Sequence, residues 1–320
     1  MSMNKMNFDF VGKRKIFFAI SIALMVIGLA VNIFMGVNLD TSFKGGTLIK
    51  YSFSGTLDRE KVESFVEDKL KKEVSVQITD SAINTEKTLN ITLPESLSMD
   101  EQKTLRTAME TQYKDYKIEQ LTINSLSPTM GKLFFLKCLV AIALASGLLV
   151  IYVAFRFRKI GGWSAGAMAL VALLHDILVA YFAFVIFRIP LNDNFVAVVL
   201  SILGYSLNDT IVIYDRIREN RRTMEKGTPI GTVVNASINQ SFSRSFNTGL
   251  CTFLAIATVA VLAIAFNLES IISFAVPMMV GVISGCYSTV CICGPLWVVW
   301  QDYKTKKEND KNMKHKKVKL

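Results

Sequence analysis

The stretch GYSLNDTIVIYDRIREN, residues Gly204–Asn220, decides the fold because it places polar groups inside an otherwise apolar segment. The run before it, FVAVVLSIL over 195–203, is apolar enough for lipid, and a second apolar run, IVIY, follows the polar residues. The polar residues between the two runs include Asn208, Asp209 and Thr210. A charge at the bilayer centre costs about 2.5–3.5 kcal/mol on insertion scales. An acid placed here is therefore a candidate ion or proton site.

The rest of the chain has the composition of a membrane protein. It has 320 residues, of which 51% are hydrophobic, and the apolar residues are clustered. A helix needs roughly 20 apolar residues to cross about 30 Å of hydrocarbon. We expect six transmembrane helices, over Ile16–Met35, Phe134–Phe155, Trp163–Phe187, Phe195–Tyr214, Phe246–Phe266 and Ile271–Trp300. The sixth contains Pro277 and Pro295, so we expect it to kink or to end near Pro295.

The positive charges predict the orientation of the helices. Lysine and arginine residues gather before span 1, between spans 2 and 3, between spans 4 and 5, and in the tail from Lys304, which holds eight lysines. Such residues concentrate on the cytoplasmic side. We therefore expect a multi-pass protein of the bacterial cytoplasmic (inner) membrane with both termini in the cytoplasm. The net charge of +10 is better explained by topology and contact with membrane lipid than by nucleic acid.

Residues 37–133 have a different composition and are expected outside the cell membrane as one domain. They contain 13 Lys and Arg against 15 Asp and Glu, with few long apolar runs. Alternation and helical spacing predict strands from Gly46, Val74, Thr88 and Tyr116 and helices from Asp58 and Met99, with Ser98 as an N-cap. This β-α-β-β-α-β order is the ferredoxin-like arrangement. No catalytic constellation is visible, so we expect a binding or mechanical surface.

Two further polar sites interrupt the apolar helices. His175-Asp176 lies in span 3, and the polar run Asn235–Thr248 before span 5 contains Arg244. Adjacent side chains on a helix project about 100° apart, so His175 and Asp176 do not form a metal site by themselves. A packed helix–helix hydrogen bond is the alternative interpretation of both acids. Arg244 is the best available partner for Asp209, although counting along straight helices does not establish a contact.

The motif LDTSFKGGT, after span 1, marks the point at which the chain enters the exported domain. It contains Asp40, Gly45 and Gly46, and glycine permits backbone angles that other residues resist. A tight turn from the helix into the sheet explains the two glycines on pattern alone. The five cysteines all lie in spanning segments and lack zinc-ligand spacing, which favours small apolar residues over a metal site.

Together these motifs resemble the SecF family, the smaller half of the SecDF membrane complex. The match rests on GYSLNDTIVIYDRIREN, LDTSFKGGT, the HD pair, INQSFSRSFNT and the order of the spans. The resemblance implies one RND-like six-helix half, a SecD-like six-helix partner, and assistance of polypeptide export through the SecYEG channel, with proton flow linked to movement of the exported domain. It assigns proton coupling to Asp209 and Arg244, with Asn208, Thr210, Asp176 and His175 as supporting residues. Asp40 matches the position of the acid in the family's first motif, and the resemblance implies no role for it.

Two other functions stay open at this stage. One is half of an RND-type proton-driven exporter of small molecules or lipids, and the other is a scaffold that stabilises a partner. No G-x-x-x-x-G-K-[ST] motif occurs, so an ATPase is not expected, nor is any other enzyme. No cofactor is expected beyond a proton gradient, and sodium is not excluded. We divide the chain into 1–36, 37–133, 134–303 and a basic tail, 304–320.

Overall fold

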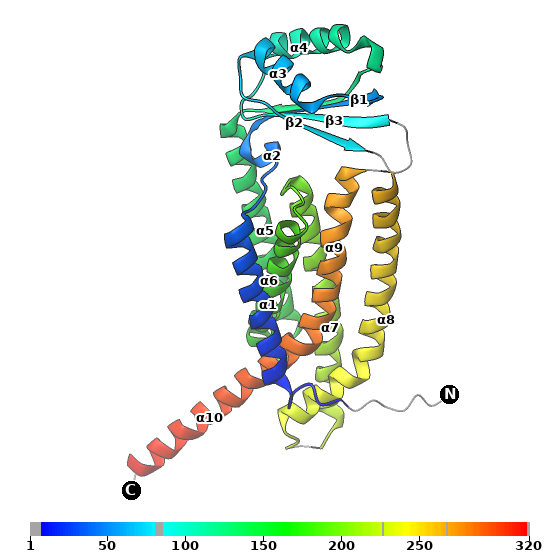
Figure 1. Cartoon of the computed structure of the whole chain (residues 1–320). Coiled ribbons are helices and arrows are strands. Elements are labelled where there is room, and N and C mark those ends of the chain that lie inside the picture. Colours follow the sequence, from blue (N-terminus) through cyan, green and yellow to red (C-terminus); the bar gives the residue numbers. More distant parts are fainter. Residues whose placement is uncertain (1–7, 81–85, 226, 267, 319–320) are drawn as a thin grey trace, which may run out of the picture.

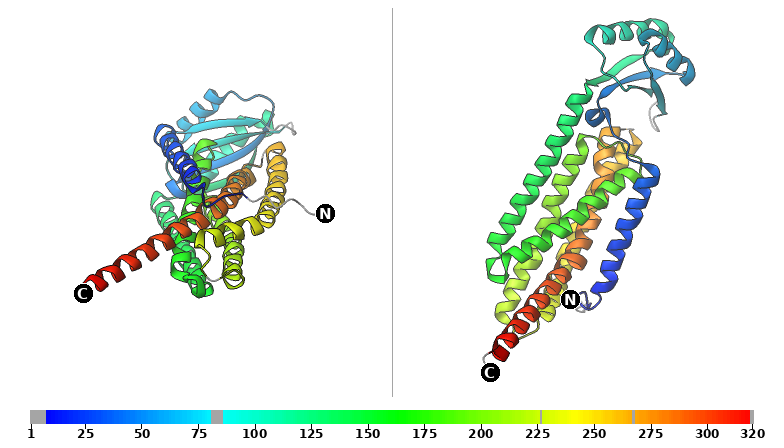
Figure 2. Two further views of the ribbon diagram at one scale, coloured as in Figure 1. Left: turned by 90° about the horizontal axis from the view of Figure 1, so that it is seen from below. Right: turned by 90° about the vertical axis from the view of Figure 1, so that its left-hand side faces the viewer.

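The structure is a computed structural model that describes residues 8–80, 86–225, 227–266 and 268–318. Figure 1 shows a bundle of long helices with a small α+β domain at one end, while the start of α1 and all of α10 lie at the opposite end. Figure 2 shows the bundle from below and from the side, where the green helix α5 runs its full length and leads directly from the sheet.

The described residues contain six helices that are long and apolar enough to cross a membrane, as many as the sequence predicted. They are α1 (Arg14–Met35), α5 (Pro128–Arg156), α6 (Gly162–Ile186), α7 (Asp193–Thr223), α8 (Ile230–Ala265) and α9 (Glu269–Ser288) with its continuation. At least half of the apolar window of α6, α7 and α9 is buried, against 17% or less for α1, α5 and α8. Helices α6, α7 and α9 therefore form the interior of the bundle.

Small residues allow the interior helices to approach closely. A Cβ atom on Gly281 of α9 would lie 2.1 Å from the Ile202 side chain of α7, and one on Gly285 would lie 3.2 Å from Ser206. A Cβ atom on Gly249 of α8 would lie 2.2 Å from the Cys286 sulfur. Close backbone approach of this kind is how membrane helices gain packing contacts without a hydrophobic driving force.

One predicted helix boundary is wrong. The polar run Asn235–Thr248 does not precede the fifth span but lies within α8, which begins at Ile230, directly after Pro229. Polar side chains do not end a helix whose backbone hydrogen bonds are intact, and proline fits at a helix start. Of the two outcomes predicted near Pro295, a kink or a helix end, the helix end does not occur, because Pro295 is only the second residue of α10 (Gly294–Val318).

The expected kink in the sixth span is present, and it precedes Pro295. A π-helical segment, η3 (Thr289–Cys293), separates α9 from α10. Figure 1 shows α10 leaving the bundle obliquely after this segment. Single-turn π segments are a recognised cause of sharp bends in helices. The basic tail predicted from Lys304 is thus the outer part of a helix that continues to Val318.

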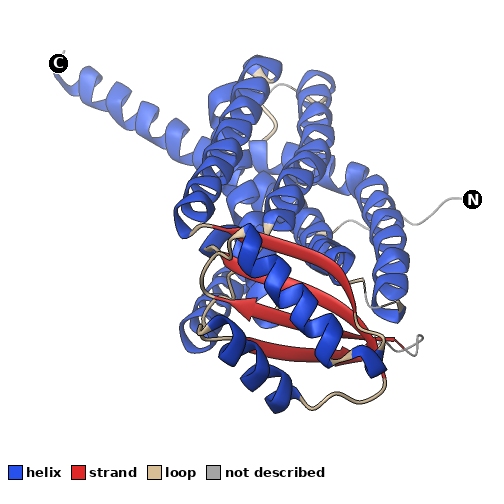
Figure 3. Ribbon diagram, turned by 90° about the horizontal axis from the view of Figure 1, so that it is seen from above, coloured by secondary structure: helices blue, strands red, loops and turns tan. Residues whose placement is uncertain are grey.

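The α+β domain follows the predicted order of strands and helices. It comprises α2 (Thr41–Lys44), β1 (Gly46–Ser54), α3 (Arg59–Leu70), β2 (Ser75–Asp80), β3 (Glu86–Leu93), α4 (Met99–Gln112), the short 3₁₀ turn η1 (Lys114–Tyr116) and β4 (Glu119–Leu126). The strands form one sheet in the order β2-β3-β1-β4, and every neighbouring pair is antiparallel. Figure 3 shows α3 and α4 lying across the outer face of this sheet.

Buried and partly buried residues alternate along β1, and this pattern distinguishes the two faces of the sheet. Ile49, Tyr51 and Phe53 are buried in a core with residues of α3 and α4 such as Val66 and Leu105. The residues between them along the strand are only partly buried and project from the opposite face. Because α3 and α4 cover one face (Figure 3), this second face is turned toward the helical bundle.

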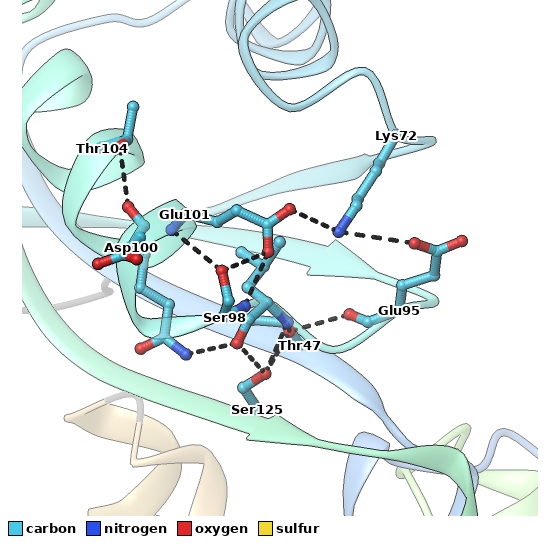
Figure 4. Close-up of polar contacts among 10 residues, drawn as sticks. Thr47, Lys72, Glu95, Ser98, Asp100, Glu101, Thr104 and Ser125 are labelled. Carbon is cyan, nitrogen blue, oxygen red and sulfur yellow. Dashed lines mark hydrogen bonds and ion pairs between the residues drawn. The ribbon is translucent and has the colours of Figure 1, made fainter.

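A hydrogen-bonded cap fixes the start of α4, as predicted for Ser98. Ser98 and Glu101 form a capping box, in which Glu101 Oε2 accepts from the Ser98 backbone N–H at 2.8 Å. Lys72 Nζ lies 2.9 Å from Glu101 Oε1 (Figure 4). These contacts lower the pKa of Glu101 to about 2 from its ordinary 4.5, with the Lys72 hydrogen bond as the largest cause.

The lowered pKa of Glu101 predicts a pH-dependent contribution to the stability of the α+β domain. The contribution is complete above about pH 4.5 and is lost as the pH falls toward 2. We therefore expect Glu101→Gln to lower the thermal unfolding midpoint at pH 7, by a margin that narrows as the pH falls through this window. Asp100→Asn removes a neighbouring carboxylate for which the described residues show no ion pair, and is the control. A constant margin for Glu101→Gln across the window would contradict the role of its charge.

Candidate functional site

Asp176 on α6 is held by hydroxyl groups from two other helices. Ser206 on α7 donates to Asp176 Oδ2 at 2.7 Å, and Ser288 on α9 donates to the same oxygen at 2.7 Å. Ser284 on α9 donates to Oδ1 at 2.6 Å. The side chain has no exposed surface. A carboxylate offers about four lone-pair positions, so three hydroxyls satisfy most of them and join α6, α7 and α9.

His175 lies beside this carboxylate. Its Nδ1 atom is 3.2 Å from Asp176 Oδ1 and 3.4 Å from the Ser284 hydroxyl, so the adjacent side chains do meet. The Nε2 atom is buried and has no hydrogen-bond partner among the described residues. The same described residues contain no group of three or more His, Cys, Asp or Glu side chains that could hold a metal ion.

Asp209 on α7 has a different environment from Asp176. It is 5% exposed, and Ser245 on α8 donates to its Oδ1 at 2.7 Å. Its second oxygen, Oδ2, is buried and has no hydrogen-bond partner in the described part of the chain. One carboxylate oxygen therefore anchors the side chain to α8, while the other is buried without a hydrogen bond from the described residues.

Hydroxyl groups connect the surroundings of the two acids. Thr210 Oγ1 donates to the Ser206 carbonyl at 3.1 Å and lies 3.3 Å from Thr289 Oγ1 of η3. Ser206 itself donates to Asp176 and is three residues, or nearly one turn, before Asp209 on the same helix. We call the whole set the acid cluster, which consists of His175, Asp176, Ser206, Asp209, Thr210, Ser245, Ser284, Ser288 and Thr289.

Arg244 and Asn208 lie outside the acid cluster. Both are exposed, and the described residues show no hydrogen bond or ion pair between Arg244 and Asp209. Arg244 nevertheless lies in the middle of α8, next to Ser245, which contacts Asp209. The predicted fifth span began at Phe246, sixteen residues after the start of α8 at Ile230, so the sequence placed Arg244 and Ser245 before this helix and not within it.

Exposed polar residues form a stripe beside Asp209, which we call the polar stripe. On α8 the stripe consists of Gln240, Arg244, Asn247 and Thr248. At about 100° of rotation per residue, these positions lie on one side of the helix. On α7 the exposed residues Ser201, Gly204 and Asn208 follow similar spacing. The polar stripe lies on helices that span the membrane, where polar side chains are costly when they face lipid.

The sequence interpretation identified both acids but not the serines that bind them. Ser284 and Ser288 are separated by four residues in an apolar helix, so they project from the same face of α9. That spacing is the signal that could have indicated a partner for an intramembrane acid. Ser245 was hidden by the incorrect start of α8, which left it outside the predicted span.

The glycine motif forms the joint between α1 and the sheet. Asp40 caps the short helix α2, with Oδ1 accepting from the Ser42 backbone N–H at 2.9 Å. Gly45 and Gly46 have φ angles of +82° and +117°, which favour glycine. A Cβ atom on Gly45 would lie 2.4 Å from Pro128 Cα, where α5 begins. The chain thus enters and leaves the α+β domain through one tight contact.

These features define a class: a multi-pass membrane protein with buried carboxylates between its inner helices and a polar α+β domain at one end of its bundle. Residues 105–303 match the family described as protein export membrane protein SecD/SecF, C-terminal. The chain belongs to this family.

Individual relatives agree with that assignment. The chain is 31% identical to the protein translocase subunit SecF of Alicyclobacillus acidocaldarius, covering 95% of this chain and 96% of the relative. It is 34% identical to SecF of Calditerrivibrio nitroreducens, over 92% and 94% of the two chains. It is also 31% identical to the SecDF subunit of Bacillus subtilis, over 94% of this chain but only 39% of the relative.

The structure resembles a crystal structure of SecDF from Thermus thermophilus, described as a translocon-associated membrane protein. The TM-score is 0.74 at 27% identity, covering 92% of this chain and 39% of that one. A SecDF structure in a super-membrane-facing form gives a TM-score of 0.63, covering 97% and 41%. The chain therefore spans about two fifths of the SecDF chains that it resembles.

The joint predicts a specific difference between two glycine substitutions. Gly36 and Gly45 share backbone angles that are essentially restricted to glycine, with φ, ψ of 64°, 171° and 82°, 172°. A Cβ on Gly36 would meet no atom within 4 Å, whereas one on Gly45 would collide with Pro128. We expect Gly45→Ala to lower the thermal unfolding midpoint in detergent clearly more than Gly36→Ala does. Equal midpoints would show that the close approach to Pro128 does not constrain the joint.

Proposed function

We propose that this protein is an auxiliary subunit of the Sec translocase that promotes protein export across the bacterial cytoplasmic membrane. The support is membership of the SecD/SecF family and the names of its relatives, which are protein translocase subunits. The similarity to a translocon-associated SecDF structure agrees with this role. The channel served would be SecYEG, and the substrate an exported polypeptide. No catalytic activity is proposed.

The half-satisfied carboxylate of Asp209 supports the use of a proton gradient. Its Oδ1 is fixed by Ser245, and its Oδ2 is buried without a partner among the described residues. A buried acid in a membrane helix is a candidate proton or ion site. Asp176 is a weaker candidate, because three hydroxyls already occupy its oxygens. We assign proton binding to Asp209 and, through its position beside Ser245, a supporting role to Arg244.

The polar stripe supports a SecD-like partner. Arg244, Asn247 and Asn208 are exposed on spanning helices, and a lipid environment would leave their polar groups without hydrogen bonds. A second membrane domain packed against α7 and α8 would cover them. Transporters of this kind contain two six-helix halves related by an axis along the membrane normal. In this proposal the present chain supplies one RND-like half, and the SecD-like subunit supplies the other.

The remaining surfaces fit the same arrangement. The strand order β2-β3-β1-β4 with antiparallel neighbours supports a ferredoxin-like exported domain, whose polar surface would meet the exported polypeptide. Apolar side chains exposed on α1, such as Ile33 and Phe34, would contact membrane lipid. Nucleic acid is not part of the proposal. The domain boundaries proposed from sequence, 37–133 and 134–303, are retained.

The charge distribution supports an orientation with both termini in the cytoplasm. Arg216, Arg218, Arg221 and Arg222 lie at the end of α7, and the lysines from Lys304 to Lys317 lie on α10. Figure 1 shows that α10 and the lower end of α7 lie at the end of the bundle opposite the sheet. The positive-inside rule places that end in the cytoplasm.

Substitution of Asp209 tests proton coupling. Asp209→Asn keeps the size of the side chain and an acceptor for Ser245, but an amide cannot exchange a proton near neutral pH. We expect the variant to insert and fold, yet to lose the part of export that depends on an imposed proton gradient. The measurement is export of a secreted substrate into membrane vesicles with and without a proton gradient, and with a sodium gradient in its place.

Asp215→Asn is the matched control for this experiment. Asp215 is six residues further along α7, and its carboxylate pairs with Arg156 and Arg218 at 3.2 and 2.8 Å. Because Asp215 is half-buried at the basic end of the helix, we expect its substitution to leave the gradient response largely intact. If Asp209→Asn responds to the gradient as the unmodified protein does, Asp209 is structural and the chain acts as a scaffold.

Orientation can be tested by labelling with a membrane-impermeant thiol reagent. Lys61 in the α+β domain is highly exposed, with 81% of its side chain accessible, and Lys307 on α10 is also exposed. On intact cells we expect a cysteine at position 61 to be labelled and one at position 307 to be protected. Labelling of the unmodified chain gives the background from its own five cysteines. The reverse pattern would invert the proposed topology.

A further inference from the structure

One helix, α9, contacts both the α+β domain and the acid cluster. Its first residue, Glu269, forms an ion pair with Lys50 of β1. Fifteen residues further on, Ser284 donates a hydrogen bond to Asp176. A rise of 1.5 Å per residue places these two contacts about 22 Å apart along the axis. The helix therefore extends from the sheet, at one end of the bundle, to the buried carboxylate of α6.

The outer contact is polar and involves neighbouring strands. Lys50 and Asn90 are register partners on β1 and β3, and both reach Glu269: Lys50 through the ion pair and Asn90 through its Nδ2 atom at 3.4 Å. In the described residues, no other ion pair joins the α+β domain to the bundle. The side chains of Lys50 and Glu269 are 26% and 42% exposed. Water can replace such a contact, and exposed pairs of this kind contribute little to stability.

The opposite side of the α+β domain is attached more firmly. Both chain connections pass through the joint at Gly45 and Pro128. The segment before the joint pairs with the loop between α6 and α7, where Leu191 donates its N–H to the Asn38 carbonyl at 2.7 Å and Asp40 donates to the Leu191 carbonyl at 3.1 Å. The domain thus has a covalent joint on one side and an exchangeable polar contact with α9 on the other. This arrangement permits rotation about the joint once the polar contact opens.

The inner contact depends on the state of the carboxylate. Ser206 and Ser288 both donate to Asp176 Oδ2, while Ser284 donates to Oδ1. A protonated carboxyl oxygen becomes a donor and keeps only part of its acceptor capacity. Protonation of Oδ2, which accepts from both Ser206 and Ser288, therefore requires one of these two hydrogen bonds to reverse or break. Three other titratable side chains lie around this carboxylate: His175 on α6, Cys286 on α9 and Cys293 on η3. A change in charge within this group therefore alters the attachment of α9 to α6.

We infer that α9 couples the exported domain to the acid cluster, with Glu269 as the positioning residue at its outer end and Ser284 and Ser288 at its inner end. The inference rests on the proposed function, and it adds the structural element that transmits the movement. Gly281 and Gly285 place α9 directly against α7, which carries Asp209. Small sliding shifts of such closely packed helices are a known mode of conformational change. A shift of α9 relative to α6 and α7 moves Glu269 away from Lys50 and releases the domain.

A disulfide cross-link across the outer contact tests this coupling. With Lys50→Cys and Glu269→Cys in the full chain, assembled with its membrane partners in vesicles, a permeant bifunctional thiol reagent that forms a disulfide with each cysteine joins β1 to α9 across the span of the original side chains. We expect the rate of cross-linking to fall severalfold when a proton gradient is imposed, because the contact then opens more often. We also expect the completed cross-link to remove gradient-dependent export, and a reductant to restore it.

Matched variants separate coupling from general effects. Lys72→Cys with Glu101→Cys replaces an ion pair within the α+β domain (Figure 4), and its cross-linking rate should not respond to the gradient. The double variant Ser284→Ala, Ser288→Ala should abolish the effect of the gradient on the cross-linking rate between cysteines 50 and 269. These two cysteines should still cross-link. Each single cysteine variant controls for reaction with the five native thiols.

The outcomes distinguish this inference from the proposed function. If the cross-linked protein keeps its gradient-dependent export while Asp209→Asn loses it, proton coupling stands and α9 is not the transmitting element. A cross-linking rate at the 50–269 pair that is unchanged by the gradient would overturn the inference in the same way. If Asp209→Asn keeps the gradient response, the proposed proton coupling itself fails. The coupling is supported directly if the cross-linking rate at the 50–269 pair responds to the gradient and the double variant Ser284→Ala, Ser288→Ala abolishes that response.

Discussion

The requirement that a carboxylate inside a membrane be surrounded by donors shapes the interior of this protein. Burying an ionised carboxylate without partners is far more costly than burying a neutral polar group. Asp176 meets this requirement through Ser206, Ser284 and Ser288, which come from two different helices. The three inner helices must therefore keep a fixed register around one side chain, and the packing of the outer helices follows from that register.

Glycine and serine allow this register to form. Hydrogen bonds of 2.6 to 2.7 Å from short serine side chains require helix backbones to lie close together. Gly281 and Gly285 supply the necessary space on α9, facing Ile202 and Ser206 of α7. The same principle operates outside the bundle, where Gly45 lets the chain pass directly beside Pro128. Residues with little side-chain volume thus hold the polar contacts of the interior and the attachment of the α+β domain.

The sequence predicted those elements whose signals are local. Alternation in GTLIKYSFS identified β1 with its correct bounds, and the apolar runs identified all six spans. The start of α8 was missed because hydropathy measures apolarity, whereas Asn235–Thr248 is helical and polar. For Pro295 the sequence left open a kink or a helix end. The bend lies just before it, in η3, and the proline itself stands near the start of α10, where it costs no hydrogen bond. The serine contacts of Asp176 could not be predicted, since they join residues 30, 108 and 112 positions apart.

The two acids of the cluster, Asp176 and Asp209, differ in how many hydrogen bonds their carboxylate oxygens accept. Asp176 accepts three hydroxyl hydrogen bonds and has no exposed surface, so most of its acceptor positions are filled within this chain. Asp209 accepts one from Ser245, and its second oxygen has no partner in the described residues. In the assembly proposed above, the second oxygen of Asp209 and the neighbouring polar stripe, whose exposure to lipid would be costly, belong to one site that a second membrane subunit completes.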